Sequence, residues 1–327
     1  MKVIHIDPPL KESACGQITR SSIPTGTVIT IGKFEALHQG HSHLIEKTIK
    51  YAQARNDTCY RSLASAVLSF APHPTQVLSD PKYKPLFSHE EQAFLLNQYD
   101  IDYWIPYPFD QNLAQLSPKA FCQRLQKQFN CKALFIGEGF RFGRNREGTA
   151  EKLHNLGQAL GIEIITIPYR RLDNQTKIST SQIRAYLAKG QIQASNKLLS
   201  RPFLILGTVQ KGRQLGRTIG FPTANVHPAD NKFLPPDGVY ASKIIIGEEK
   251  KTGITNIGTN PTVADKQSRK VETHIFDFDS DIYGEKIIVE LHTFIRPERT
   301  FDGIESLGQQ IAADTLEARS VLTDRRD

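Results

Sequence analysis

The sequence predicts two regions of different fold class: a parallel α/β sheet in the first part of the chain and an antiparallel β-barrel or sandwich in the second. Up to about residue 187, short apolar runs alternate with amphipathic stretches of helical length, which is typical of a parallel sheet. From Arg201 onward, strand-like runs follow one another across turns without intervening helices, which indicates an antiparallel architecture. The 327 residues suffice for one to three domains with normal cores.

In the first part, apolar and β-branched runs predict strands at residues 2–6, 28–31, 66–70, 133–136 and 162–167. Helices are expected over residues 41–55 and 149–160, after Ser88 with a capping box to Glu91, and after Ser117 with Pro118 at the first position. The run 103–109 is strand-like but contains prolines, so we expect its later part at a sheet edge or in a loop.

In the second part, the pattern predicts strands at residues 203–209, 238–246, 270–278 and 286–294. A helical connector over residues 185–199 comes before them, and Gly190 is expected to divide it into two short helices. The chain ends in a predicted helix over residues 304–322. We therefore expect a small all-β region closed by a terminal helix.

Composition indicates an ordinary soluble protein with anionic partners. Charged residues make up 23% of the chain, hydrophobic residues 39%, and the formal net charge is +7. No block of five or more Lys or Arg occurs, so nucleotides are expected and nucleic acid is not. No secretory leader or run of eighteen apolar residues is visible, and the four scattered cysteines suit reduced thiols, so we expect a cytoplasmic protein without a membrane partner.

The stretch from Val28 to His41 predicts a phosphate site. An apolar strand over 28–31 is followed by Gly32, and Gly40 separates His38 from His41 at the start of a helix. A helix N-terminus after a glycine turn presents backbone N–H groups to an anion, and both histidines can face it. Simple surface polarity is the alternative. A metal site is not favoured, because no cysteine or carboxylate cluster accompanies the histidines.

Three further stretches of the first part suit anionic ligands. His73 lies in a rigid Ala71-Pro-His-Pro74 turn, which either lines a cleft or is only structural. The loop 137–148 combines glycines with Arg141, Arg144 and Arg146, although it can also be a solvated charged loop. Ser179 and Thr180 are expected to cap a helix beside Arg184, either as a phosphate site or as a plain N-cap.

The segment Lys211–Asn225 predicts a magnesium–nucleotide site. Glycines at 212, 216 and 220 make its backbone accessible, and Arg213 and Arg217 add positive charge. Thr223 and Asn225 supply hard oxygen ligands after Phe221-Pro222. Mg²⁺ bound with a nucleotide needs few protein oxygens, because phosphates and water supply the rest. A glycine-rich hairpin without a ligand is the alternative.

These motifs resemble those of the prokaryotic bifunctional riboflavin kinase/FMN adenylyltransferase (FAD synthetase) family. Residues 32–41 resemble its Gly-x-Phe-Asp-Gly-x-His-x-Gly-His signature, with Glu35 in place of Asp and Ala36 in place of Gly. The loop after residue 137 resembles Gly-x-Asp/Asn-Phe-x-Phe-Gly, with Gly139 at the polar position, and residues 178–184 resemble Ile-Ser-Ser-Thr-x-Ile-Arg. Residues 212–225 resemble the riboflavin kinase signature almost letter for letter, and motifs at 236–241, 256–262, 278–284 and 294–298 follow in the same order.

The resemblance implies a Rossmann-like nucleotidyltransferase domain over residues 1–187, a connector over 188–199 and a riboflavin kinase barrel over 200–327. The barrel would phosphorylate riboflavin to FMN with ATP. The first domain would adenylylate FMN to FAD and release pyrophosphate. Riboflavin, FMN, FAD and ATP are thus the implied partners, with Mg²⁺ as cofactor; no particular protein partner is indicated.

The resemblance also implies roles for individual residues. Glu272, which without it is only a polar residue on a strand, falls where the family has its catalytic glutamate. His38 and His41 would stabilise charge at the α-phosphate, and Thr223 and Asn225 would bind magnesium. The implied nucleotide or cofactor contacts are Gly32, Phe34, Gly40, Ser179, Thr180, Arg184, Gly212, Arg217, Gly220, Pro222, Thr223 and Asn225.

Two alternatives stay open at this point. The substitutions at 35, 36 and 139 allow a riboflavin kinase whose first domain binds a nucleotide or flavin but is catalytically weak or inactive. The positive charge allows a nucleic-acid-binding protein, which the absence of charge blocks disfavours. With both ATP-dependent sites predicted, we expect FAD synthesis that is present but slower than FMN formation.

Overall fold

A computed structural model describes residues 1–6, 26–56, 63–171, 178–212, 216, 220–259 and 269–323. Its contacts divide the chain into two compact units, residues 1–84 with 92–178 and residues 85–91 with 179–327. The expected combination of a parallel α/β sheet and an antiparallel barrel is confirmed. The finer domain boundaries at 187 and 200 stay a prediction.

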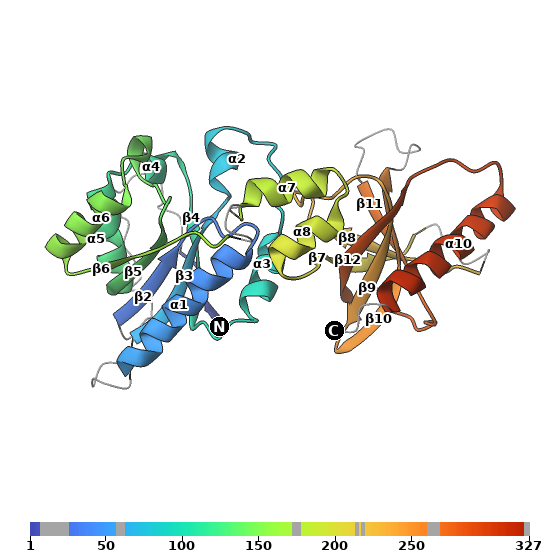
Figure 1. Cartoon of the computed structure of the whole chain (residues 1–327), viewed down its shortest axis with the longest axis horizontal. Helices are drawn as coiled ribbons and strands as arrows, with labels where there is room; N and C mark the ends of the chain where they lie inside the picture. Colours follow the sequence, from blue (N-terminus) through green and yellow to red (C-terminus); the bar gives the residue numbers. More distant parts are fainter. Residues whose placement is uncertain are drawn as a thin grey trace. The chain divides into compact units, whose positions relative to one another are not determined.

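The first unit is built on a six-stranded sheet in the order β1-β4-β3-β2-β5-β6, with every neighbouring pair parallel (Figure 1). Its strands are β1 (Lys2–Val3), β2 (Gly26–Ile31), β3 (Leu63–Ala71), β4 (Tyr103–Pro108), β5 (Cys131–Gly137) and β6 (Glu163–Ile167). Because all strands run the same way, their carboxyl ends meet at one edge, which is where open α/β sheets bind ligands.

Helices cover both faces of this sheet, because alternate side chains of each strand point to opposite faces. Ile29 and Leu134 pack with residues of α5 (Pro118–Phe129) and α6 (Ala150–Leu160) in one apolar cluster. Val28 and Phe135 pack instead with α1 (Gln39–Asn56), through Leu44, Tyr51 and Ala52. The remaining elements are short: α2 (Pro74–Leu78), α4 (Gln111–Ala114) and the 3₁₀ turn η1 (Arg144–Arg146).

Local signals set the ends of these helices. The Ser117 hydroxyl accepts a hydrogen bond from Ala120 N ahead of Pro118, and left-handed Asn130 ends α5. The expected proline-containing strand is β4. Its first residues, Tyr103 and Trp104, pair with β1, and no described strand pairs with its later part on that side. Pro106 and Pro108 thus remove no hydrogen bond needed on that side.

The second unit is a closed barrel in the order β10-β11-β8-β7-β12-β9, with antiparallel neighbours (Figure 1). The barrel, and not the sandwich, is therefore the fold of this half. Its strands are β7 (Phe203–Gln210), β8 (Ala224–Pro228), β9 (Gly238–Ile246), β10 (Glu249–Thr259), β11 (Arg269–Ile275) and β12 (Lys286–Pro297). Strands β8 and β10 were not among the runs that the sequence pattern predicted.

Helices before and after the strands accompany the barrel. The predicted connector over 185–199 forms the end of α7 (Thr180–Ala188), which begins five residues earlier, and all of α8 (Ile192–Leu199); Gly190, with φ 70°, separates the two helices. The terminal helix is α10 (Ile304–Thr323), which packs on β9, β10 and β12. Among the described residues, no helix is long and apolar enough to cross a membrane.

A segment from the first half of the sequence, residues 85–91, belongs to the barrel unit. It leads into α3 (His89–Leu96), whose predicted capping box is present, since Ser88 and Glu91 exchange backbone-to-side-chain hydrogen bonds. Glu91 Oε1 also accepts from Leu206 N at 2.8 Å, and Glu91 Oε2 forms a fully buried ion pair with Lys232 Nζ at 2.7 Å. Burial lowers the pKa of Lys232, and Glu91 opposes that shift. The segment is therefore tied to the barrel by a charge pair that water does not reach.

Candidate functional sites

The first candidate site begins at the turn after β2, at the carboxyl edge of the parallel sheet. A Cβ added at Gly32 would lie 3.2 Å from the Phe34 ring, so a larger residue would need that ring to shift. Phe34 and Leu37 adopt left-handed backbone angles, with φ 46° and 44°, and both side chains are buried. A left-handed conformation is unfavourable for such residues, so the surrounding packing holds this turn in its shape.

The two predicted histidines lie together at the start of α1. Their rings stack with centroids 3.9 Å apart and an interplanar angle of 10°. His38 precedes the helix, and its Nδ1 accepts hydrogen bonds from Gly40 N at 3.1 Å and His41 N at 3.4 Å. A Cβ at Gly40 would lie 3.1 Å from the His38 ring, which explains the glycine. A neutral His38 consequently carries its proton on Nε2.

The two substitutions in this turn are both accommodated. Ala36 is buried and is not among the described residues with positive φ, so it has no need of glycine. Glu35 is 2% exposed, and the Tyr83 hydroxyl donates to its carboxylate at 2.9 Å from each oxygen. His73 Nε2 lies 3.4 Å from Glu35 Oε2. The sequence pattern suggested a cleft or structural role for His73 but gave no signal for Tyr83.

The glycine-rich loop after β5 lies near this turn. Burial lowers the pKa of Lys33, Glu35 opposes this shift, and Arg146 adds a smaller lowering effect. The place that a side chain at Gly139 would occupy is filled by the Tyr169 hydroxyl, which comes from the end of β6. A phenol therefore stands where the resembled motif has Asp or Asn. Sequence reasoning missed Tyr169, because only the neighbouring carboxyl ends of β5 and β6 bring it there.

Ser179, Thr180 and Arg184 lie on α7, in the second unit. The predicted cap is present: the Ser179 hydroxyl accepts from Gln182 N at 3.3 Å, and Thr180 is the first helical residue. The Arg184 guanidinium lies 4.9 Å from the centroid of the Phe233 ring. This cation–π contact fixes the arginine beside the helix N-terminus.

The second candidate site is a row of polar residues across three barrel strands. Glu272 on β11 is directly opposite Asn225 on β8 and Asn256 on β10. All three side chains are half-buried, while the alternating neighbours Val271 and Thr273 are buried in the barrel. Directly opposed residues of antiparallel strands have side chains within contact reach. The strand register therefore gathers the predicted base and one predicted metal ligand.

The segment leading into β8 completes this site. Thr223 shares the face of Asn225, because the two residues are separated by one buried strand position. Gly212 is necessary, since a Cβ there would collide with the Asn225 amide, and Gly220 adopts φ 82°. Pro222 O accepts a hydrogen bond from His274 Nδ1 at 2.8 Å. The predicted Arg217, like Arg213, lies outside the described residues.

The residues present fit a magnesium ion bound together with a nucleotide. The Thr223 hydroxyl and the Asn225 amide are hard oxygen donors on one face. Across the described part of the chain, no group of three His, Cys, Asp or Glu could hold a metal by itself. An ion at this position would thus take most of its ligands from phosphates and water, as Mg²⁺ does.

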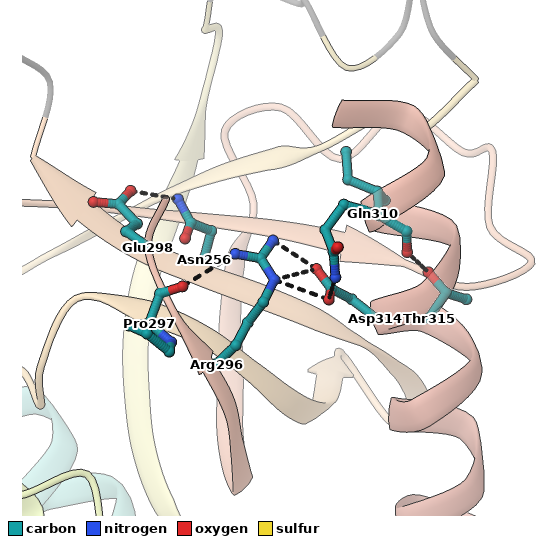
Figure 2. A network of polar contacts seen from close by, with 8 residues as sticks. Asn256, Arg296, Pro297, Glu298, Gln310, Asp314 and Thr315 are labelled. Atoms are coloured by element: carbon teal, nitrogen blue, oxygen red, sulfur yellow. Dashed lines mark hydrogen bonds and ion pairs between the residues drawn. The ribbon is translucent and has the colours of Figure 1, made fainter. Parts of the chain in front are cut away.

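A carboxylate from the end of β12 extends the row. Asn256 Nδ2 donates to Glu298 Oε1 at 3.1 Å (Figure 2). Glu298 follows Arg296 and Pro297, and Arg296 binds Asp314 of α10 through Nε at 2.9 Å and Nη2 at 2.7 Å. Gln310 Nε2 also donates to Asp314 Oδ1, at 2.7 Å. The terminal helix therefore fixes the strand end that carries Glu298.

Comparison with known proteins covers both halves of the chain. The family model for FAD synthetase matches residues 20–182, and that for riboflavin kinase matches residues 199–322. Proteins named bifunctional riboflavin kinase/FMN adenylyltransferase are similar over most of their length. The one from Listeria monocytogenes is 32% identical and the alignment covers 100% of both chains; for Escherichia coli K12 the values are 36%, 90% of this chain and 92% of the relative.

A third relative of that name, from Bacillus subtilis, is 33% identical, with 97% of both chains covered. Among solved structures, one titled as a macrolide-efflux protein from Streptococcus pneumoniae has a TM-score of 0.81 and 30% identity. It covers 91% of this chain and 95% of its own. The same pair of folds in one chain is thus found in a solved structure.

Proposed function

This chain belongs to the bifunctional riboflavin kinase/FMN adenylyltransferase family, and we propose that its barrel converts riboflavin to FMN and its parallel-sheet domain converts FMN to FAD. Both reactions use ATP, so the chain is a transferase with two activities. The monofunctional kinase alternative is not favoured, because both family models match and the relatives carry both names.

In the kinase reaction, Glu272 is the proposed base. Its carboxylate takes the proton of the riboflavin 5′-hydroxyl, the hydroxyl oxygen bonds to the γ-phosphorus of ATP, and ADP leaves. Phosphoryl transfer depends mainly on positioning and charge stabilisation. A strand pair on each side of Glu272 supports this role, because both pairings restrict where its carboxylate can lie.

The segment 212–225 is the proposed binding site for the nucleotide and its magnesium. Thr223 and Asn225 would hold the ion, which when bound neutralises charge on the phosphate oxygens. Gly212 and Gly220 leave the backbone accessible, Pro222 fixes the approach to β8, and Arg217 adds positive charge. Support comes from the shared face of Thr223 and Asn225 and from the contact of Asn225 with Gly212.

In the adenylyl transfer, His38 and His41 are the proposed groups that stabilise charge. A phosphate oxygen of FMN bonds to the α-phosphorus of ATP, and pyrophosphate leaves. The stacked rings of His38 and His41, with centroids 3.9 Å apart, can face the same phosphate group. Gly32, Phe34 and Gly40 shape the turn around them. On the second unit, Ser179, Thr180 and Arg184 are separately proposed to bind nucleotide phosphates through the N-terminus of α7 and the guanidinium.

The observation that carries the bifunctional proposal is the intact histidine pair. Despite Glu35 and Ala36, the turn keeps both imidazoles stacked at the N-terminus of α1. The test is a time course with riboflavin and Mg-ATP in which FMN and FAD are separated by chromatography. We expect FMN first and FAD more slowly, and no product when EDTA removes the magnesium. FMN without any FAD at all FMN and Mg-ATP concentrations would leave only the kinase.

We further propose that the protein acts in the cytoplasm without a nucleic-acid or membrane partner. The supporting features are its scattered cysteines, of which Cys122 and Cys131 are buried free thiols, and the absence of Lys/Arg blocks in its sequence. Burial raises the pKa of the Cys122 thiol to about 11, which makes it unreactive at neutral pH. Cell fractionation and a filter-binding assay with duplex DNA and RNA test this.

A further inference from the structure

Three titratable side chains from separate segments meet behind the histidine turn. Glu35 comes from the turn itself, His73 from the residue before α2, and Tyr83 from the stretch after α2. Glu35 and His73 are 2% and 8% exposed, so their contacts are sheltered from water. A buried carboxylate is costly unless donors surround it. The buried Glu35 carboxylate therefore depends on the polar groups around it.

The hydrogen bonds of the cluster define its geometry. The Tyr83 hydroxyl donates to Glu35 from a position 2.9 Å from both carboxylate oxygens. The His73 ring stacks on Tyr83, with centroids 4.9 Å apart. His73 Nδ1 accepts from Thr75 N at 3.2 Å, so a neutral His73 carries its proton on Nε2, the atom 3.4 Å from Glu35 Oε2. The Tyr83 hydroxyl therefore donates to the carboxylate, and His73 Nε2 lies beside it within ion-pair distance, without a hydrogen bond to it.

The helix α2 fixes His73 and Tyr83 relative to each other. His73 N donates to Gln76 Oε1 at 3.0 Å, and Gln76 Nε2 donates to Tyr83 O at 2.9 Å. One glutamine side chain thus ties the backbone of His73 to that of Tyr83. Tyr83 and His73 are therefore held together as the surroundings of the Glu35 carboxylate.

Glu35 lies between the two strained residues of the turn. Phe34 and Leu37 have φ 46° and 44°, and His38 follows directly. Strain of this kind costs about 1–3 kcal/mol per residue and persists only where the surroundings over-determine it. Apolar burial of Phe34 and Leu37 supplies part of that constraint. The polar contacts of Glu35 with Tyr83 and His73 supply another part, which depends on direction. A shift of the turn would carry His38 and His41 with it.

We propose that Tyr83 and His73 are positioning residues for FMN adenylylation, which hold Glu35 and thereby fix the turn that places His38 and His41. This inference rests on the proposed function of the parallel-sheet domain. Neither Tyr83 nor Glu35 needs to touch substrate. The extra methylene of Glu35, compared with the aspartate of the resembled motif, brings its carboxylate to the Tyr83 hydroxyl and next to His73 Nε2.

The first experiment compares two Tyr→Phe variants of the full chain. Tyr83→Phe removes the hydroxyl on Glu35 and keeps the ring that stacks on His73. Tyr51→Phe is the matched control, because its hydroxyl also donates to a glutamate, Glu163, at the amino end of β6 and so at the opposite edge of the sheet. For each variant, kcat and KM for FMN and Mg-ATP are measured, with riboflavin phosphorylation as a second readout.

We expect Tyr83→Phe to lower kcat for FAD formation by about tenfold to a hundredfold, the scale on which misplaced catalytic groups reduce rates. KM values should change less than about threefold, because the substrates' own contacts stay in place. Tyr51→Phe and the kinase rate should match the parent. Equal FAD formation by both variants, with an active parent, overturns the positioning role and leaves the proposed function standing.

A second readout does not depend on turnover. The ring nitrogens of the ten histidines are followed by long-range ¹H–¹⁵N NMR in uniformly ¹⁵N-labelled protein, with His38 and His41 assigned by substitution. Tyr83→Phe should shift the His38 and His41 signals, and Tyr51→Phe should not. Unmoved signals in Tyr83→Phe overturn the proposal even if the parent makes no FAD, whereas an inactive parent with shifted signals refutes only the proposed reaction.

Glu35→Asp sharpens the test, since it installs the residue of the resembled motif. The shorter side chain withdraws from Tyr83 and His73, so we expect FAD formation to fall about as far as in Tyr83→Phe. The double variant should be no slower than either single one, because both changes break the same contact. A faster Glu35→Asp enzyme would show that Glu35 is a handicap and would overturn the inference.

Discussion

The two candidate sites differ in how the chain holds their reactive groups. In the barrel, Asn225, Glu272 and Asn256 lie opposite one another on three neighbouring strands, so backbone hydrogen bonds on both sides set their spacing. In the parallel sheet, His38 and His41 lie beyond the end of β2, after a turn with two left-handed residues. No strand register reaches them.

This difference determines what each site requires from distant residues. A register specifies a row of side chains through the strands alone, since a one-residue slip would reverse every face. A strained turn has competing conformations and must be fixed by contacts from elsewhere in the chain. Tyr83 and His73 provide such contacts for Glu35, and Tyr169 fills the space beside Gly139. The departures from the family motif therefore cluster where side chains from outside the motif can compensate.

The largest effect is expected from removing the proposed base, Glu272, from the barrel site. Glu272→Gln should lower FMN formation by about 10²- to 10⁴-fold, the usual contribution of a general base. ATP binding and FAD formation from added FMN should persist, because the shape of the side chain is retained and the second reaction uses another domain. Glu249→Gln, an exposed glutamate on β10, is the control. Near-parent FMN formation in Glu272→Gln would place the base elsewhere.

In the histidine turn after β2, His41→Ala should lower FAD formation by about 10²- to 10³-fold, the effect of losing one preorganised group that stabilises charge. FMN formation should be unaffected, so the variant would accumulate FMN from riboflavin. His43→Ala is a suitable control, as it removes a histidine from the same helix two residues further on. If both variants retain FAD formation, the histidine pair has no role in the transfer.

Stability offers a third comparison, between a buried and an exposed ion pair of the second unit. Glu91→Gln leaves the Lys232 ammonium without its counter-charge, which should lower the free energy of unfolding by about 3–5 kcal/mol. The neighbouring Glu90 pairs with Lys286 at the surface, where both side chains are 60% exposed, so Glu90→Gln should cost less than about 1 kcal/mol. Urea unfolding of both variants measures the difference; equal midpoints would contradict it.

The smallest effect is expected from restoring the family glycine at position 36. Ala36 has no positive φ and its side chain is buried, so Ala36→Gly gains no conformational relief. FAD formation should stay within about twofold of the parent, and stability should fall by about 0.5–1 kcal/mol through added backbone freedom. A large increase in FAD formation would mean that the turn is held in an unproductive shape.

The sequence by itself determined the fold classes and most element positions. Apolar alternation, together with signals such as Ser117-Pro118 and Gly190, acts within a few residues and is readable along the chain. The capping box of Ser88 and Glu91 was predictable for the same reason. The histidine pair and the segment 212–225 were likewise recognisable, because the functional residues of each motif lie close together in the sequence.

Only the tertiary structure decided the partners of those residues. Strands β8 and β10 carry weak local patterns, yet they supply Asn225 and Asn256 on either side of Glu272. Glu91 also reaches Lys232, 141 residues away, and Tyr83 reaches Glu35 across 48 positions. Such pairings depend on which surfaces the folded chain brings together, and no periodicity records them. In the closed barrel every strand pairs on both sides, and the sequence pattern of separate strands does not show whether the two ends of the sheet pair with each other.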